Sequence, residues 1–151
     1  MAMKRLFLAL SVLFAAVACA PNDGDDLQRY EIGDHYNVGG VEGVVIALEE
    51  GAHHGTIVGL TEPDEELIWE TANSWCNSQG EGWYAPSIEE LGRVYGVREI
   101  LASLGAGLHA SFYWSCEENG ADYGRYVNMQ NGNDNHGTKG MPCWARAVRK
   151  F

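Results

Sequence analysis

The pattern of apolar and polar positions predicts a β-hairpin near the start of the globular part. Segments 41–48 and 56–60 are short runs rich in β-branched residues, and the turn-forming segment 49–55 separates them. Two such runs joined by a turn are typical of antiparallel strands. The adjacent His53 and His54 would point to opposite faces of a strand, so we interpret them as loop residues rather than as a metal pair.

Helical spacing follows the hairpin. Trp69, Ala72 and Cys76 recur at intervals of three and four residues, which marks one face of a helix within 63–79. We expect the acidic run 64–66 in its first turn, where the helix dipole favours negative charge. The tryptophans of this region are interpreted as core residues rather than as a platform for sugars; the prediction covers Trp69, Trp75, Trp83 and Trp114.

A capping box marks a second helix. The hydroxyl of Ser87 can accept from the amide of Glu90 while the Glu90 carboxylate reaches back, and an apolar stripe then continues to Gly96. This double role explains Glu90 without any catalytic function. Residues 97–108 are predicted to form a third short helix or a helix-like connector.

The C-terminal stretch 110–151 has a different pattern. It opens with the aromatic run 112–114 and closes with a second strand-like run over 144–151. Between these runs lie five of the nine asparagines of the chain, five glycines and few large aliphatic residues. Such a segment cannot bury enough apolar surface to build a core. We therefore predict loops and short strands held by a packed scaffold, where binding surfaces usually lie; a solvated loop without function is the alternative.

The N-terminus carries the pattern of a lipoprotein signal peptide over 1–18. Positive residues precede an apolar run over 6–17, which is too short to span a bilayer. Segment 16–19, Ala-Val-Ala-Cys, resembles a lipobox, so Cys19 is expected to carry fatty acyl chains such as palmitate that anchor the protein in a lipid bilayer. Plain secretory cleavage is the alternative.

An acidic, turn-rich segment over 19–31 is predicted to be a flexible tether. Its acids resemble a signal for export to the cell surface, although an ordinary solvated linker explains them equally well; they are Asp23, Asp25 and Asp26. The globular domain is expected over 32–151.

Charge excludes one class of partner. The formal net charge is −11, and removal of Lys4 and Arg5 with the signal peptide takes it to −13. Seventeen of the 21 acidic residues precede residue 100, whereas the remainder of the chain has four acids and five bases. An acidic body without a basic patch does not bind nucleic acid.

Several spaced motifs resemble the closing half of a C-type-lectin-like domain, namely segments 113–115, 127–132 and 146–149. More closely, they resemble a bacterial lipoprotein branch related to the C-terminal domain of Legionella collagen-like protein. Segment 83–91 is similar to the Trp-Arg-Leu-Pro-Ser-x-x-Glu-Leu signature of that family, with Tyr84-Ala85 in place of Arg-Leu. The resemblance implies an α+β fold, shared with formylglycine-generating enzymes, in which two or three helices pack on short antiparallel sheets with long irregular loops.

Within this branch, the asparagine-rich interior and the Arg-Ala-Val-Arg-Lys-Phe end resemble the variable region of proteins diversified by retroelements. In those proteins, errors at adenines convert asparagine codons into codons for Tyr, Asp, His, Gly, Ser, Thr, Ala, Pro, Cys, Phe, Arg and others, but not for Trp, Met, Lys, Glu or Gln. The resemblance implies a variable region over 110–151. Positions that fit the allowed set are Phe112, Asp122, Tyr123, Gly124, Tyr126, Asp134, His136, Gly137, Thr138, Pro142 and Cys143, whereas Glu117, Glu118, Met129 and Gln130 are expected to be scaffold.

We therefore expect a surface-exposed lipoprotein of the outer membrane or cell surface that binds an external protein or glycan through one outward face. Aromatic residues would supply rigid contact area and short polar residues would supply specificity. The predicted contact residues are Phe112, Asp122, Tyr123, Gly124, Tyr126, Asp134, Asn135, His136, Thr138 and Trp144. Calcium at 131–135 is a runner-up, but the sugar-binding motifs of calcium-dependent lectins are missing and glycine-asparagine richness explains the cluster without a metal.

Cysteine usage leaves several pairings open. Cys76, Cys116 and Cys143 are an odd number in an oxidising compartment, and Cys116 and Cys143 flank the loop region that they could cross-link. In related domains a helix cysteine pairs near the C-terminal strand, where this chain has Ala147, which implies that Cys76 is an unpaired buried thiol.

No nucleophile has an adjacent base, so we expect neither an enzyme nor a cofactor. An enzyme of the formylglycine-generating type and a structural, adhesive or fimbrial component of the cell envelope remain as alternatives.

Overall fold

The computed structural model describes residues 27–151. Three helices and two antiparallel sheets make it a mixed α+β fold, as expected. The predicted signal peptide, the lipidation site Cys19 and the acids Asp23, Asp25 and Asp26 lie outside the described residues. Within 27–151, no helix has the length and apolar character needed to cross a membrane.

The larger sheet contains five strands in the order β1-β2-β3-β8-β4. It includes the predicted hairpin, now seen as β2 (Val41–Leu48) paired antiparallel with β3 (Gly55–Val58). β1 (His35–Val38) extends the sheet on one side, and β8 (Val148–Lys150) with β4 (Trp83–Tyr84) extends it on the other. The histidines between β2 and β3 lie in the loop, as predicted.

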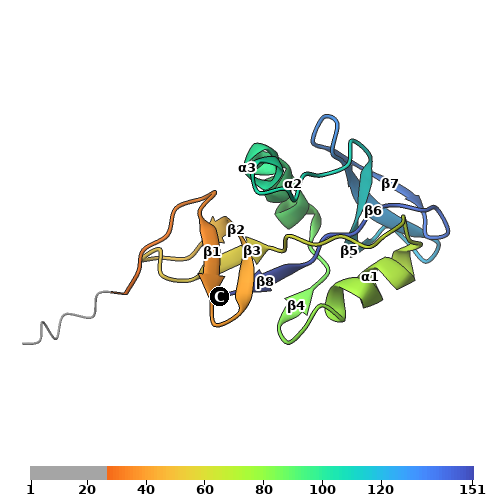
Figure 1. Ribbon diagram of the computed structural model, residues 1–151. Coiled ribbons are helices and arrows are strands. Elements are labelled where there is room, and N and C mark those ends of the chain that lie inside the picture. The colour runs from red at the N-terminus through yellow and green to blue at the C-terminus, as the bar shows by residue number, and fades with distance from the viewer. Residues whose placement is uncertain (1–26) are drawn as a thin grey trace, which may run out of the picture.

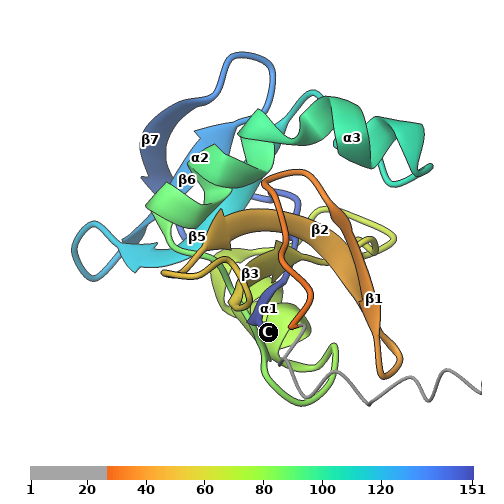
Figure 2. The same cartoon turned by 90° about the vertical axis from the view of Figure 1, so that its left-hand side faces the viewer.

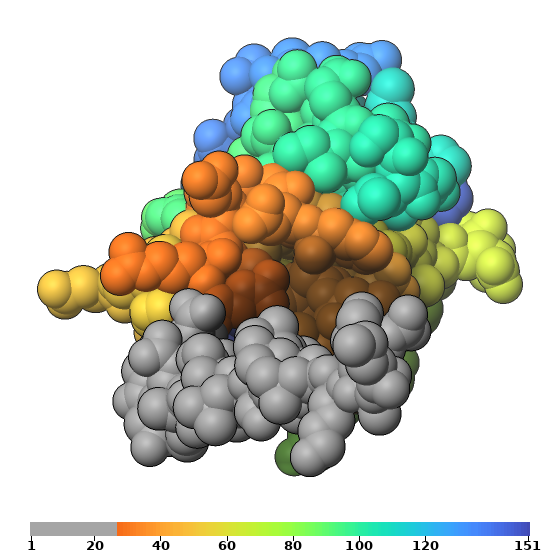
Figure 3. All heavy atoms as spheres, turned by 60° about the vertical axis from the view of Figure 1, so that its left-hand side comes forward, coloured from red at the N-terminus to blue at the C-terminus, as the bar shows by residue number. Residues whose placement is uncertain are grey.

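Both ends of the described chain meet beside this sheet (Figure 1). Tyr30 and Tyr36 pack on the C-terminal Phe151 with ring centroids 5.1 and 4.5 Å away. Tyr30 is buried, and its amide donates to the carbonyl oxygen of Ala52 at 2.8 Å. The globular domain therefore begins by Tyr30, and the predicted tether over 19–31 is too long. Figure 3 views this end, where the orange hairpin β1–β2 lies below the green and teal helices.

Helix α1 (Trp69–Asn77) begins later than the sequence predicted. The residue Leu67 exchanges two main-chain hydrogen bonds with Cys143, at 2.7 and 3.0 Å, so the chain is extended there and cannot yet be helical. The acidic run 64–66 consequently lies in the preceding loop, and Glu70 is the acidic residue of the first turn.

Helix α2 (Ile88–Gly96) has the predicted capping box, and α3 (Arg98–Ser103) is a shortened version of the predicted third helix. Ser87 Oγ accepts from the Glu90 amide at 3.1 Å, and Glu90 Oε2 accepts from the Ser87 amide at 2.9 Å. The carboxylate of Glu117 accepts the Ile88 amide at 2.5 Å, which joins the helix to the second sheet. Figure 2 shows α2 and α3 lying across the sheet above β2.

The second sheet contains β5 (Phe112–Glu118), β6 (Tyr123–Asn128) and β7 (Asn133–Thr138), in that order and all antiparallel. The asparagine-rich middle is thus largely a regular hairpin rather than long irregular loops. The sheet lies between α2 and α1: Tyr113 and Val127 share one core cluster with α2, and Trp114 shares another with α1. Trp114 is buried, whereas the other predicted core tryptophans are half-buried against the same cluster; they are Trp69, Trp75 and Trp83.

Candidate functional site

The predicted contact residues lie mainly on β6 and β7, but on both faces of the sheet. Directly paired residues of neighbouring strands share a face. Tyr123 is paired with Thr138, and Arg125 with His136. These side chains lie on the face of the sheet toward α2, which we call the α2 side. Tyr126 lies three positions after Tyr123 and therefore points to the opposite face, the α1 side. The single outward face that we expected is wrong for this reason.

On the α2 side, exposed polar and aromatic side chains lie close together. The rings of Tyr123 and His136 meet edge to face with centroids 5.8 Å apart, and Tyr123 is 44% exposed. Arg125 lies between two carboxylates, with Nη2 2.5 Å from Asp134 Oδ2 and Nη1 3.4 Å from Glu117 Oε1. The sequence did not predict Arg125 as a site residue, although it lies two positions after Tyr123 on β6 and therefore on the same face. Its two partners hold its side chain and neutralise its charge.

On the α1 side, the aromatic residues are half-buried rather than freely presented. Tyr126 packs against Phe112 and Trp114, with ring centroids 4.7 and 5.9 Å away. Asn135 is exposed, and its Oδ1 accepts the His136 amide at 2.9 Å. The half-buried rings offer an apolar floor beside β7.

Gly124 belongs to the packing of the sheet rather than to a contact surface. It is buried, and a Cβ at this position would lie 2.5 Å from Cδ1 of Trp69 and 3.1 Å from Trp114. The position requires glycine because α1 approaches β6 here. Its assignment as a contact residue is therefore not supported.

Trp144 lies apart from β6 and β7. It follows the opposite edge of β5, where its amide donates to Phe112 O at 2.9 Å. The ring of His109 stacks on its indole, with centroids 3.7 Å apart and an interplanar angle of 8°. The structure therefore separates Trp144 from the other predicted contact residues.

The exposed remainder of the predicted set forms what we call the β6–β7 surface. It consists of Asp122, Tyr123, Asp134, Asn135, His136 and Thr138. Asp122 and Thr138 lie at the strand ends, where the Lys139 amide donates to Asp122 O at 2.9 Å. At the other end of the hairpin, a Cβ on Gly132 would lie 2.7 Å from Tyr95 of α2. The hairpin is thus anchored at its turn, and its β7 strand is exposed along nearly its whole length.

The asparagine cluster 131–135 is explained by its own turn structure. Asn131 Oδ1 accepts the amide of Asn133 at 2.9 Å, and Asp134 is paired with Arg125. Short side chains that bond the main chain in this way stabilise turns. Among residues 27–151, no three His, Cys, Asp or Glu side chains are grouped so as to hold a metal ion.

All three cysteines in the described part of the chain are free. The link between Cys116 and Cys143, one of the pairings left open by the sequence, is not formed: Cys143 is buried beside Leu67, while Cys116 is exposed on β5. Burial raises the pKa of the Cys76 and Cys143 thiols to about 12. Partial burial, and then the Glu117 carboxylate, raise the pKa of Cys116. Protonated thiols are weak nucleophiles at neutral pH.

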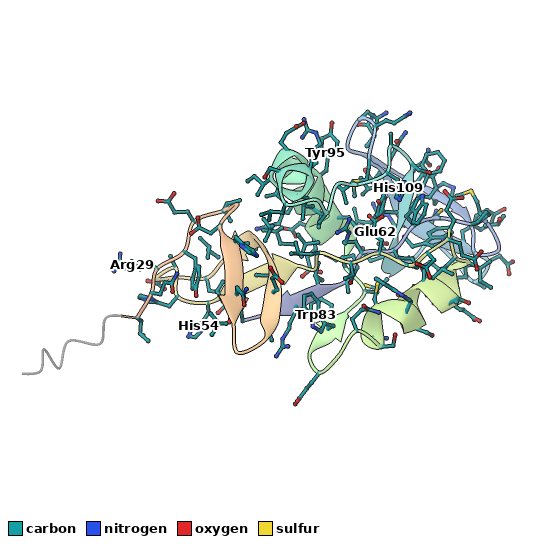
Figure 4. The ribbon with its side chains drawn as sticks, viewed as in Figure 1. Arg29, His54, Glu62, Trp83, Tyr95 and His109 are labelled. Carbon is teal, nitrogen blue, oxygen red and sulfur yellow. The ribbon has the colours of Figure 1, made fainter. Side chains whose placement is uncertain are left out.

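A polar cluster that sequence reasoning missed lies near Trp144, on whose indole His109 stacks. Two of its members, Glu62 and His109, are labelled in Figure 4. Arg146 is 1% exposed; it donates to Glu62 at 2.5 Å and to two main-chain carbonyls at 3.0 and 3.1 Å. The Tyr113 hydroxyl donates to the same carboxylate, and His109 Nε2 lies 3.2 Å from its second oxygen. Burial and the hydrogen bond to Glu62 raise the pKa of Tyr113. No local pattern predicts a pair 84 residues apart.

Comparisons with known proteins do not assign this chain to a family. No protein-family model matches the chain, and no curated protein matches it. The fold and the candidate site define a mixed α+β domain that exposes one antiparallel hairpin.

Proposed function

We propose that this protein is a lipid-anchored, surface-exposed binding protein of the outer membrane or cell surface. Its domain is of the C-type-lectin-like class, and its β6–β7 surface binds an external protein or glycan. The surface belongs to a region, 110–151, that is diversified by a retroelement. The acyl chains on Cys19 hold the protein at the bilayer.

One observation carries this proposal. The first described residues and β1–β3 lie at one end of the molecule, whereas β6 and β7 lie at the other end (Figure 1). A protein attached through its N-terminus would therefore direct β6 and β7 away from the membrane. This is the orientation that capture of an external ligand requires.

The character of the side chains supports the same proposal. Tyr123 and His136 combine flat rings with polar groups, as contact residues of binding proteins do. The turn of the hairpin packs against Tyr95, so the hairpin is held in place before a ligand arrives. A preorganised surface loses less conformational entropy on binding.

Sequencing the same locus in related isolates tests the diversification. We expect substitutions at the exposed positions of the β6–β7 surface, and none at Glu117 or Met129, which hold α2 and fill the core. A neighbouring reverse transcriptase gene with a near-copy of 110–151 would support the proposal. Substitutions spread evenly along the chain would exclude diversification and favour a structural component of the envelope.

Binding to arrays of glycans and displayed proteins tests the surface itself. The double substitution Tyr123→Ala with His136→Ala should weaken any captured ligand about tenfold or more, because aromatic contact residues commonly carry that much binding energy. The matched control is His53→Ala with His54→Ala at the opposite end of the molecule, which should change nothing. Equal effects of the two double substitutions would exclude the β6–β7 surface.

Incorporation of an alkyne-tagged fatty acid tests the anchor. The wild-type chain should take up the label and remain with the membrane fraction, whereas Cys19→Ser should do neither. Labelling that persists in Cys19→Ser would contradict lipidation at this residue.

A further inference from the structure

The free edge of β7 is the part of the β6–β7 surface where the two faces of the sheet meet. β7 pairs with β6 on one side only and is the last strand of its sheet. Asp134, His136 and Thr138 lie on the α2 side, whereas Asn133 and Asn135 alternate with them on the α1 side. A ligand that contacts side chains of both faces must therefore lie along this edge.

The hydrogen-bond register shows which main-chain groups face outward from β7. The Lys139 amide donates to Asp122 O, directly opposite in the register, so this pair is a hydrogen-bonded one. Hydrogen-bonded and non-bonded pairs alternate along an antiparallel ladder. Residues 133, 135 and 137 thus bond β6, while residues 134, 136 and 138 direct their main-chain groups away from the sheet.

Several of these outward groups have no partner within residues 27–151. They are the N–H and C=O of Asp134, the C=O of His136 and the N–H of Thr138. The Thr138 carbonyl oxygen accepts from Met141 at 2.8 Å, and Asn135 Oδ1 occupies the His136 amide. The remaining groups have the spacing that an added antiparallel strand requires.

The edge also lacks the features that usually prevent strand addition. Natural edge strands are protected by lysine, proline, bulges or unpaired charges. β7 contains neither lysine nor proline, its pairing with β6 is regular over all six residues, and its one charged side chain, Asp134, forms an ion pair with Arg125. The strand is exposed over nearly its whole length.

We propose that the ligand of the β6–β7 surface is an extended segment of another polypeptide, which adds to β7 as an antiparallel fourth strand. This inference rests on the proposed function and specifies the class of ligand. Main-chain hydrogen bonds supply affinity that tolerates changes of side chain, and side chains on alternate faces supply specificity. A second copy of this chain is disfavoured as the occupant. Each copy has a formal net charge of −11, or −13 without the signal peptide, so two copies repel each other.

The test uses the full-length chain in detergent and a phage-displayed library of linear peptides of roughly ten residues, enough to span an ordinary strand. Selected peptides are then measured against Asp134→Pro and Thr138→Pro. Each substitution removes an outward N–H without touching the ladder to β6. The matched controls Asp134→Ala and Thr138→Ala lose the same side chains but keep the N–H.

Binding to each proline variant should be about tenfold weaker than binding to its alanine control. On the unaltered protein, peptide binding should slow hydrogen exchange at the amides of Asp134 and Thr138, and leave that of Asn135 unchanged. The exchange measurement keeps the proposal falsifiable if a proline variant fails to fold.

Equal binding to proline and alanine variants, unchanged exchange at Asp134 and Thr138, or a library without binders would overturn strand addition. So would a dimer of the free protein that Asp134→Pro dissociates, since a second copy would then occupy the edge. If Tyr123→Ala with His136→Ala weakens binding while the proline variants do not, the binding surface stands and only strand addition fails. If neither set of variants weakens binding, the proposed function fails as well.

Discussion

Gly124 shows at the scale of one residue how closely the two layers approach. The indole of Trp69 fills the space where a side chain would lie, and its position is held by a hydrogen bond to Ser115 O at 2.8 Å and by Lys139 above the ring. The ring therefore cannot move aside at low cost. Gly124, whose identity fits the set expected at variable positions, is therefore required by packing.

Gly124→Ala should lower the free energy of unfolding by about 1–3 kcal/mol, because the added methyl group overpacks a fixed contact. Chemical denaturation followed by circular dichroism measures the loss. Gly92→Ala is the matched control. Gly92 is exposed on α2 and nothing lies within 4 Å of the added Cβ, so the free energy of unfolding should rise by about 0.5–1 kcal/mol. Destabilisation by both substitutions would contradict a specific role for Trp69.

Arg146→Met should lower the free energy of unfolding by about 3–5 kcal/mol, because the Glu62 carboxylate, only 12% exposed, loses its guanidinium partner and keeps only Tyr113 and His109 beside it. Combining it with Glu62→Gln should cost less than the sum of the two single changes, because both act on one ion pair. Denaturation of the four proteins in this cycle measures the coupling.

Arg93→Met is the control for that cycle. Arg93 pairs with Glu89 on the exposed face of α2, where ion pairs contribute little, and its loss should change stability by less than about 0.5 kcal/mol. Strict additivity of the Arg146 and Glu62 changes would show that the buried pair does not act as a unit.

At the scale of elements, the start of α2 connects the two sheets. Its first amides donate hydrogen bonds to three side chains. Ser87 and Glu90 accept within the capping box, and Glu117 of β5 accepts as well. Glu90 also accepts from the Tyr84 hydroxyl at 2.8 Å, which ties β4 to the same point. Negative charge at this helix end is favourable for the helix dipole as well.

Ser87→Ala should lower the free energy of unfolding by about 1 kcal/mol, because the Glu90 amide loses its acceptor. Thermal unfolding would show this as a lower midpoint temperature. Ser103→Ala is the control, since its exposed hydroxyl only donates to a carbonyl at the end of α3 and should contribute almost nothing. An unchanged midpoint in Ser87→Ala would mean that Glu117 alone is sufficient to cap the helix.

At the scale of the whole molecule, the two sheets have different roles. The larger sheet gathers both ends of the described chain around Tyr30 and Phe151, and the smaller sheet projects its free edge at the far end. Buried thiols lie in the core between α1 and the C-terminal segment, in one cluster with Trp114. Their ionisation therefore reports on the integrity of the whole domain.

Stability should fall as the pH rises from 9.0 to about 12. The pKa of Cys76 and Cys143 is about 12 in the folded protein, above the ordinary 9.0, so their contribution is complete below pH 9.0 and is lost as the pH approaches the folded value. Denaturation midpoints across this range should fall less steeply in Cys76→Ala with Cys143→Ala. Cys116→Ala should change the slope less than the double substitution does, because the pKa of this partly buried thiol is raised less; an identical slope in all three proteins would contradict the prediction.

Local patterns predicted much of the fold. The β-branched runs 41–48 and 56–60 with the turn between them predicted β2 and β3, and the spacing of Ser87 and Glu90 predicted the start of α2, because these signals act between near neighbours. The start of α1 was misplaced because Leu67 pairs with Cys143, a partner far along the chain. The division of Tyr123 and Tyr126 between two faces followed from strand alternation once β6 was known to be regular.

The sequence by itself determined the β2–β3 hairpin, the start of α2, the acidic character of the body and the composition of 110–151, because propensity, charge and local capping are properties of short segments. Only the tertiary structure decided which residues meet. It buried Gly124 under Trp69, covered Trp144 with His109, joined Arg146 to Glu62 and left the edge of β7 unpaired. These outcomes depend on contacts between distant segments, whose energies no local pattern records.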